Sequence, residues 1–576
     1  MREWAVRVKV KPAGISTALV LGALAVGCLD TTDSTPLPVA SLSVSPSVTT
    51  LHIEQAVQLQ VTARNARGRA MPLLPALTWA SSDTSVVRVS PSGVAVAESM
   101  GTATLTVRTR SIEATATVTT IARDPRPNII VLITDDARTG DFDYTPQIRA
   151  LLSDSGMTFD NFFVTTGTCC PSRASILRGQ YAHNHQTLTN LPPAGSFMEF
   201  RALGNEASTL ATWLHAAGYE TGLFGKYLNL YPGFPNPDLT YVPPGWDSWH
   251  AVFSPSEGNP AYYYYSLNED GVSTDYGEAP SDYLTDVLTD RVSKFVTQAQ
   301  FRGTPFFMYI APYAPHEPST PSPTHLGAFA GVPAPRTPAF NEADVSDKWL
   351  GVRRLPLLTD SAIADLDARY DDRLASLLSV DDMVKALLAG LRQTGSLDNT
   401  YVFLLSDNGL ETGEHRMVML KETPYEETIR VPLVVRGPGI PFGVHNAAMT
   451  LNIDLAPTIM DLASSPAPAF VDGRSLAPLL SGTPPGSWRH AFAEEVWAED
   501  SSPAPRLIFQ ELRSDSYAYV EYYDGERELY DIRNDPYELS SIYSTTPKSL
   551  ISQLSGWLAE LRTCAASSCR VLDVAP

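Results

Sequence analysis

An unbroken apolar run directly ahead of two carboxylates is the feature that most constrains the fold. Residues 128–134 read Asn-Ile-Ile-Val-Leu-Ile-Thr, without the polar alternation of a strand that has one solvent face. Such a run is typical of a parallel strand that is covered on both faces. Helical periods follow it at residues 148–152 and 210–217. This alternation of buried strand and helix predicts a doubly wound α/β domain.

The same pattern continues along the chain. Further runs of strand length lie at residues 222–224, 305–310, 401–405 and 431–435. A helical period carried by residues 383–391 leads into the third of them. By contrast, residues 231–280 and 312–360 are rich in Pro, Tyr and Trp and only weakly periodic. We expect them to be long loops, which in an α/β enzyme are usually functional.

Two of the predicted strands end in side chains that suit a hard cation. Asp135 and Asp136 follow the first strand, and Asp407 and Asn408 follow the strand at 401–405. Either pair alone is compatible with a turn or a helix cap. Two pairs at equivalent strand ends converge on one edge of the sheet, where open α/β sheets bind ligands. Their oxygens suit Ca²⁺ or Mg²⁺, and no cluster of histidines is spaced for zinc.

The stretch 168–179 reads Thr-Cys-Cys-Pro-Ser-Arg-Ala-Ser-Ile-Leu-Arg-Gly. Pro171 fits the first turn of a helix, where its missing N–H is not needed. A cysteine at a helix N-terminus near Arg173 is predicted to be reactive rather than buried. The alternative is a small buried thiol, a common state of free cysteine.

The full string Cys-x-Pro-Ser-Arg, three residues, Leu177, one residue and Gly179 resembles the signature of the type I sulfatases. In that family the first cysteine is oxidised to formylglycine by a formylglycine-generating enzyme. The resemblance therefore implies that Cys169 is modified and that Cys170 is a bystander. A disulfide between these adjacent residues is the sterically poor alternative.

The resemblance covers about residues 126–563 and implies the fold, the metal and the chemistry. The fold would be an alkaline-phosphatase-like doubly wound mixed sheet with a small C-terminal antiparallel sheet. One divalent cation, usually calcium, would be bound by four strand-end side chains and the modified cysteine: Asp135, Asp136, Asp407, Asn408 and Cys169. The hydrated aldehyde would attack sulfur and expel the alcohol.

The resemblance also implies roles for charged residues at successive strand ends. Arg173 would steady the nucleophile, while Lys226 and Lys421 would hold sulfate oxygens. His316 would protonate the leaving alcohol. His415 is a weaker candidate that belongs in a second layer around the site.

One position departs from the pattern of many arylsulfatases. Where these carry Lys-Trp-His, the chain has Lys226-Tyr-Leu-Asn229, so an active-site histidine is missing. Together with the runs at 169–185 and 423–440, this form resembles the glucosamine-6-sulfatase and extracellular heparan-sulfatase branch. We expect a sulfated sugar or polysaccharide as substrate, with Asn229 as a hypothetical substrate contact. Whether His183 and His185 touch substrate stays open.

The flanking segments predict further domains. Residues 38–122 hold short alternating strands at sandwich spacing and resemble bacterial Ig-like domains of group 2, with Trp79 in the core. Two prolines mark a boundary before a catalytic domain at 126–485. Residues 486–576 are predicted to form a C-terminal subdomain, because the alternating segment 519–539 resembles that of sulfatases.

The N-terminus predicts export. A basic start and the short apolar run 15–26 are typical of a signal peptide within residues 1–28. The end of this segment resembles a bacterial lipobox, which would make Cys28 a lipidated first residue in the periplasm or at the cell surface, followed by a linker at 29–37. Ordinary cleavage and secretion is the alternative. Cys564 and Cys569 are close enough to close a disulfide loop, which an oxidising compartment permits.

The net charge of −21 argues against a nucleic-acid binder or a general binder of anionic membranes. Membrane contact is expected only through the lipid anchor, and an anionic substrate must be drawn by a local basic pocket. Two alternatives remain. One is a phosphate or phosphonate ester hydrolase of the same superfamily. The other is a cell-surface adhesion protein whose enzyme domain is inactive.

Overall fold

The computed structural model describes residues 38–574, except 72–75, 111, 123, 234–236, 254–261, 484 and 501–504. The predicted signal segment 1–28 with Cys28, and the linker 29–37, lie outside the described residues. No helix in the described part of the chain has the length and apolar character needed to cross a membrane. The chain forms two compact units, of which the smaller holds most of residues 38–118.

The described residues between 38 and 121 contain β strands and no helix, as predicted for an Ig-like sandwich. Strand β1 (Val39–Ser45) pairs antiparallel with β4 (Gln60–Asn65). The other sheets have the orders β2-β9-β8-β5 and β3-β7-β6. Their bounds are β2 Val48–His52, β3 Ala56–Gln58, β5 Thr78–Ser81, β6 Val87–Val89, β7 Val94–Ala97, β8 Gly101–Thr109 and β9 Ile112–Ile121. Trp79 is only half-buried, with its ring lying close to Gly93.

A ten-stranded mixed sheet organises the larger unit, with the order β16-β15-β14-β13-β17-β10-β18-β21-β11-β22. Its parallel centre consists of β14, β13, β17, β10 and β18, and β21 adds to β18 in the antiparallel direction. The bounds are β10 Asn128–Thr134, β11 Met157–Phe159, β13 Glu220–Gly225, β14 Ser248–Phe253, β15 Ser266–Glu269, β16 Val272–Asp275, β17 Phe306–Ala311, β18 Thr400–Ser406, β21 Leu433–Arg436 and β22 Val444–Asn446.

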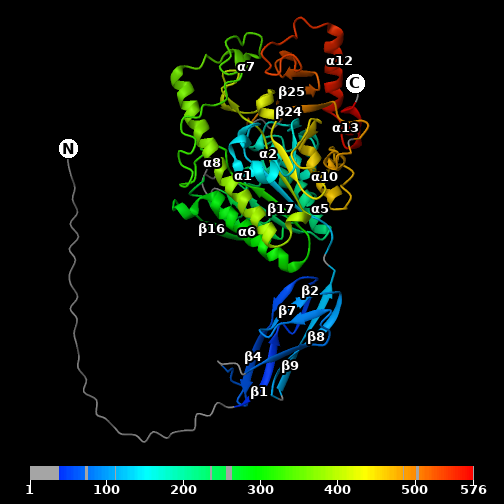
Figure 1. The fold of residues 1–576 in the computed structure, drawn as a ribbon. Helices are drawn as coiled ribbons and strands as arrows, with labels where there is room; N and C mark the ends of the chain where they lie inside the picture. Colours follow the sequence, from blue (N-terminus) through cyan, green and yellow to red (C-terminus); the bar gives the residue numbers. More distant parts are fainter. Residues whose placement is uncertain are drawn as a thin grey trace, which may run out of the picture. The chain divides into compact units, whose positions relative to one another are not determined.

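Helices cover both faces of this sheet (Figure 1). Alternate residues of β10 serve the two layers, because successive side chains of a strand point to opposite faces. Ile129, Val131 and Ile133 belong to the apolar cluster of α2 (Cys169–Arg178), α5 (Leu210–Ala216) and α10 (Leu455–Leu462). Ile130 and Leu132 belong to the cluster of α6 (Leu284–Arg302) and α8 (Asp360–Gln393). The doubly wound fold predicted from residues 128–134 is therefore confirmed.

One predicted loop is partly wrong. Residues 231–280 contain three strands, β14, β15 and β16, which extend the sheet beyond β13. Strands β15 and β16 are joined by Asp270 and Gly271, both with positive φ (52° and 89°), a two-residue hairpin turn. The prediction missed them because β15 and β16 have only four residues each and the six residues of β14 lack clear alternation.

A four-stranded antiparallel sheet, β24-β25-β26-β27, follows the ten-stranded sheet in the chain. Its strands are β24 Ala491–Trp497, β25 Leu507–Ser514, β26 Tyr517–Tyr522 and β27 Arg527–Asp531, followed by α12 (Lys548–Leu561) and α13 (Ser567–Leu572). Cys564, which follows α12, forms a disulfide with Cys569 of α13. The small C-terminal sheet predicted from residues 519–539 is thus present.

Short elements complete the larger unit around these layers. They are α1 Pro146–Ile148, α3 Ala182–His185, α4 Ser196–Ala202, α7 Leu350–Arg353, α9 Glu426–Ile429, α11 Ala477–Leu480, β12 Phe162–Phe163, β19 Glu411–Thr412, β20 Val418–Leu420 and β23 Thr450–Leu451.

Candidate active site

The register of β10 and β18 brings the two acidic pairs together. Thr134 lies opposite Ser406 in this parallel pair, so Asp135 and Asp407 leave the sheet side by side. The Asp136 N–H donates to Asp407 Oδ1 at 3.2 Å, and Asn408 Nδ2 donates to Asp136 Oδ1 at 2.7 Å. All four side chains are buried. The predicted convergence of two strand ends is therefore present in the structure.

Helix α2 places Cys169 against these carboxylates. The helix begins at Cys169 after Thr168 and ends at Arg178, where it is capped by Gly179, whose left-handed backbone (φ 65°) suits glycine. Cys169 Sγ lies 3.7 Å from Asp135 Oδ1 and 4.0 Å from Asp136 Oδ1. The first turn of α2 thus aims its cysteine at the acidic pair.

The prediction of a reactive, accessible thiol is wrong for the unmodified residue. Cys169 is only 2% exposed. Burial raises the pKa of its thiol to about 12, and this effect exceeds the opposing influence of Lys226 and Lys421. The thiol is therefore protonated near neutral pH, which is the opposite of an activated nucleophilic cysteine.

Two lysines supply the positive charge of the site. Lys226, which follows β13, lies with Nζ 2.5 Å from Asp135 Oδ2. Lys421, which follows β20, donates from Nζ to Asp136 Oδ1 at 2.6 Å and to Cys169 Sγ at 2.8 Å. Burial alone would lower the pKa of each lysine, but the carboxylates outweigh it and raise both. Both ammonium groups are therefore charged and face the cysteine sulfur and its carboxylate neighbours.

Arg173 is buried among the strand ends that form the site. Its guanidinium is fully buried, with Nε donating to Asp407 Oδ2 at 2.7 Å and Nη1 donating to the Lys226 carbonyl at 3.1 Å. Nη2 lies 3.6 Å from Asp135 Oδ2. Arg173 therefore links the ends of three strands, β10, β18 and β13, and compensates the charge of their carboxylates.

His316 comes from the loop after β17 and reaches the same group. Its Nδ1 lies 2.6 Å from the Glu317 carbonyl, so Nδ1 carries the proton of that hydrogen bond. Nε2 lies 3.8 Å from Asp136 Oδ2. The sequence predicted His316 as an acid but did not predict how close it lies to the acidic pair.

The residues fit a hard divalent cation. Among the described residues, one group of at least three metal-type side chains has donor atoms within 4.8 Å of one another: Asp135, Asp136, Cys169 and His316. Asn408 Oδ1 is buried beside this group and has no hydrogen-bond partner among the residues that the structure describes. Carboxylate and amide oxygens of this kind suit Ca²⁺ or Mg²⁺. Asp407 adjoins the group through Asp136 and Arg173.

Other histidines are engaged elsewhere in the described structure. His183 bonds to Glu495, His185 to Ser175 and His415 to Glu342. Burial lowers the pKa of His185 to about 3. His415 is fully buried.

The remaining predicted positions have weaker links to the site. Asn229 is half-buried, and its Oδ1 has no partner among the described residues. Cys170 is buried and free, with its N–H donating to Asn190 Oδ1. The sequence interpretation missed the buried Arg373 of α8, which bonds to the Asp136 carbonyl at 2.7 Å. A charged residue on the apolar stripe of that helix was the available signal.

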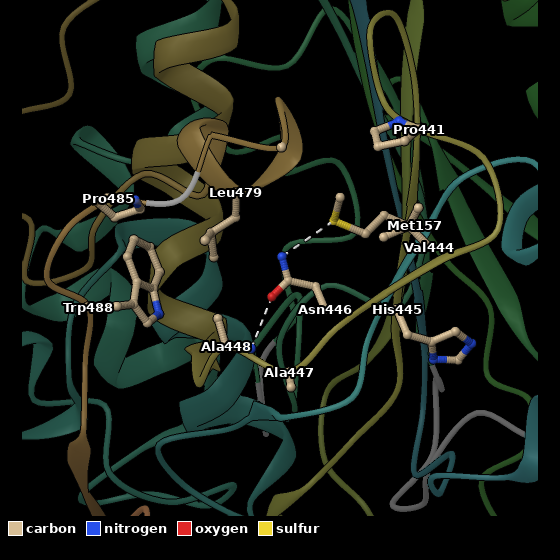
Figure 2. Close-up of a pocket in the computed structure, with 11 residues that line it drawn as sticks. Met157, Pro441, Val444, His445, Asn446, Ala447, Ala448, Leu479, Pro485 and Trp488 are labelled. Carbon is tan, nitrogen blue, oxygen red and sulfur yellow. Dashed lines mark hydrogen bonds between the residues drawn. The ribbon is translucent and has the colours of Figure 1, made fainter.

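A separate cavity of about 310 Å³ lies at the far edge of the sheet beside β22. Figure 2 shows its largely apolar walls, with Trp488, Leu479 and Val444 around Asn446. None of the predicted catalytic residues lines it.

Comparison with known proteins agrees with this geometry. The family model described as Sulfatase matches residues 127–465. The model described as N-sulphoglucosamine sulphohydrolase, C-terminal, matches residues 413–564, and the bacterial Ig-like domain (group 2) model matches residues 38–120.

Similar proteins were found both by sequence and by structure. The human N-acetylglucosamine-6-sulfatase is 36% identical over 483 residues, which cover 78% of this chain and 87% of that protein. A solved structure of a protein in complex with its substrate D-glucosamine-2-N,6-O-disulfate is 25% identical, with a TM-score of 0.59 over 78% of this chain and 99% of the other. The phosphonate monoester hydrolase of Agrobacterium radiobacter shares the fold, with a TM-score of 0.60, 21% identity and coverage of 77% and 96%. The chain therefore belongs to the sulfatase family and is an enzyme that hydrolyses sulfate esters.

Proposed function

We propose that this sulfatase removes the 6-O-sulfate of a glucosamine-type sugar, using a formylglycine made from Cys169 and a bound calcium ion. One observation carries the proposal. Lys421 Nζ lies within hydrogen-bond distance of both Cys169 Sγ and Asp136 Oδ1. The ammonium group that would bind sulfate therefore contacts both the residue that would become the nucleophile and a carboxylate of the proposed metal site. The relative named N-acetylglucosamine-6-sulfatase, and the similar structure with glucosamine disulfate, support the sugar and the position.

The proposed cation ligands are Asp135, Asp136, Asp407, Asn408 and the modified Cys169. The cation would supply positive charge that polarises the nucleophile and offsets charge on the sulfate, and hydrated formylglycine would supply the attacking hydroxyl. Arg173 forms ion pairs with Asp407 and Asp135, which would keep these two carboxylates in place around the cation.

Lys226 and Lys421 would bind the non-bridging sulfate oxygens. Both are charged, Lys226 is buried and the Lys421 side chain is only 18% exposed, so their attraction for an anion is weakly screened. When sulfate enters, each ammonium would exchange part of its contact with a carboxylate for contact with a sulfate oxygen. This local charge overcomes the repulsion expected from a net charge of −21.

His316 would donate the proton that the sugar alcohol needs as it leaves. Its Nδ1–H donates to the Glu317 carbonyl, which leaves Nε2 as the nitrogen directed at the site. Transfer of the Nε2 proton to the alcohol oxygen leaves a neutral imidazole whose remaining proton stays on Nδ1. Asn229 is proposed as a substrate contact because its buried Oδ1 has no partner among the described residues.

Other segments of the chain are proposed to determine where the protein is located and when Cys169 is modified. The segment 1–28 would direct export, with lipidation at Cys28, and the Ig-like residues 38–122 would act as a spacer. A formylglycine-generating enzyme would act on residues 168–179 before the chain folds, because Cys169 is buried in the folded protein. Domain limits of 126–485 and 486–576 are proposed for the catalytic and C-terminal parts.

The test is release of inorganic sulfate by purified full-length protein in calcium buffer. We expect release from N-acetylglucosamine 6-sulfate, none from the Cys169→Ala variant, and slower hydrolysis of 4-nitrophenyl phosphate than of 4-nitrophenyl sulfate. Faster cleavage of the phosphate or of a phosphonate ester would favour the hydrolase activity of the structurally similar phosphonate enzyme instead. No hydrolysis of any substrate, with the aldehyde at residue 169 verified, would refute the proposal and favour an adhesion protein.

A further inference from the structure

Arg373 connects the two loops that carry the acidic pair and the proposed acid. It lies in the middle of α8 and is fully buried. Nη2 donates to the Asp136 carbonyl at 2.7 Å, and Nη1 donates to the Pro315 carbonyl at 3.3 Å. Asp136 follows β10, and Pro315 directly precedes His316 after β17. One guanidinium therefore holds the backbone at Asp136, in the acidic pair, and at Pro315, next to the proposed acid His316.

A buried arginine is costly, so stability alone does not account for an arginine at this position. Removing a guanidinium from water carries a large penalty, and buried ion pairs are often replaceable by apolar residues without loss of stability. Asp141 offsets the charge, with Oδ2 accepting from Arg373 Nη2 at 3.2 Å. Asp141 is itself held by the Tyr370 hydroxyl at 3.1 Å and the Arg138 N–H at 3.0 Å. The arginine is thus built into a compensated network that aims it at two carbonyls.

The two carbonyls belong to backbone that needs support. Asp136 has a φ of 69°, in the left-handed region that is unfavourable for a residue with a side chain. The Pro315 carbonyl accepts a second bond from Ser319 Oγ at 2.7 Å, which ties it to the same loop. His316 Nε2 and Asp136 Oδ2 are 3.8 Å apart across the gap that Arg373 spans. A change in either backbone position alters this separation directly.

We propose that Arg373 is a positioning residue that sets where His316 delivers its proton. The inference rests on the proposed function of His316 as the acid. Misplacing the acid slows cleavage when the leaving group needs a proton, and has little effect when it does not. A sugar alcohol is a poor leaving group that needs protonation, whereas 4-nitrophenolate leaves without it. A misplaced His316 is therefore expected to lower kcat/KM on the sugar sulfate more than on the aryl sulfate.

The experiment compares kcat/KM on N-acetylglucosamine 6-sulfate and on 4-nitrophenyl sulfate for Arg373→Gln and Arg373→Lys. Tyr370→Phe is the matched control, because it removes one bond to Asp141 from the same helix without touching either carbonyl. The calcium-induced rise in Tm is measured for each variant as a readout independent of activity. The Lys variant keeps the charge but has one nitrogen in place of the guanidinium fork, so it carries the comparison if the Gln variant fails to fold.

We expect Arg373→Gln to lower the sugar-to-aryl ratio of kcat/KM by about tenfold to a hundredfold, and Arg373→Lys by a smaller factor. Tyr370→Phe should keep the ratio of the unmutated protein, and the calcium shift should persist in all variants. An equal loss on both substrates, an unchanged ratio, or loss of the calcium shift would overturn the inference. Hydrolysis of neither substrate by the unmutated protein would instead refute the proposed function.

Discussion

Lys421 Nζ lies 2.8 Å from Cys169 Sγ, although the two residues are 252 positions apart in the chain. The contact joins the loop after β20 to the first turn of α2. It places a fixed positive charge at the atom that the proposed maturation replaces with an oxygen.

The first prediction concerns this lysine. Lys421→Ala should lower kcat/KM on 4-nitrophenyl sulfate by roughly 10²–10³, because a preorganised charge beside the transferring group is lost. The exposed Lys294 provides a matched control, and Lys294→Ala should keep full activity. Initial rates and the Tm of both variants check the prediction. A Lys421→Ala enzyme that is folded and as fast as the control would contradict it.

The second prediction concerns metal removal. A chelator should abolish hydrolysis and lower Tm, and added calcium should restore both, because a ligand that binds only the folded state stabilises it. Asn408→Ala removes the buried Oδ1 and should raise the calcium concentration for half-restoration by about tenfold or more. Asn534→Ala, which changes an exposed amide in the C-terminal part, is the control. An equal calcium requirement in both variants would argue against Asn408 as a ligand.

The third prediction concerns pH and the pair formed by His183 and Glu495, whose Nδ1 and Oε1 atoms are 2.5 Å apart. Burial alone would lower the pKa of His183, but Glu495 outweighs it and raises this pKa. The stabilisation of the folded protein by the charged His183–Glu495 pair is therefore complete below the pKa of His183 in the unfolded chain, about 6.5. It disappears as the pH rises through the pKa of His183 in the folded protein.

Accordingly, His183→Gln should reduce the free energy of unfolding more at about pH 5.5 than at about pH 9. Urea unfolding at the two pH values measures the difference. The pair of His445 and Asp160 is largely exposed, so His445→Gln should have little effect at either pH. A His183→Gln loss that is larger at high pH would reverse the predicted sign.

The fourth prediction concerns Gly225, which directly precedes Lys226. Its φ is 109°, and an added Cβ would lie 2.1 Å from the Ala311 carbonyl oxygen. Gly225→Ala should therefore push β13 away from β17, displace Lys226 and cost about 1–3 kcal/mol from overpacking. Gly525 also has a positive φ of 93° but open space around it, so Gly525→Ala should cost only about 1 kcal/mol. Equal stability and activity of the two variants would contradict the argument.

Local sequence was enough to predict the parts of the fold that depend on burial and strand direction. The apolar run at 128–134 indicated a strand covered on both sides, and the acidic pairs indicated which sheet edge forms the site. Parallel register then brought Asp135 beside Asp407. The hairpin at Asp270 and Gly271 was equally local, yet its strands were too short to show a period.

Features that depend on long-range packing could not be predicted in this way. The burial of Cys169 follows from the elements packed around α2, which its neighbours in sequence do not reveal. Arg373 is 237 residues from Asp136, and nothing in a helical period says what a buried guanidinium bonds to. The approach of His316 to Asp136 likewise depends on how two loops close over the sheet.

Mass spectrometry of the peptide that contains residues 168–173 tests the central claim most directly. The account predicts that active protein carries formylglycine at residue 169, which is lighter than cysteine, with Cys170 unmodified. It also predicts that sulfatase activity rises in proportion to the aldehyde content across preparations. Full activity in a preparation whose Cys169 is entirely an unmodified thiol would contradict the account.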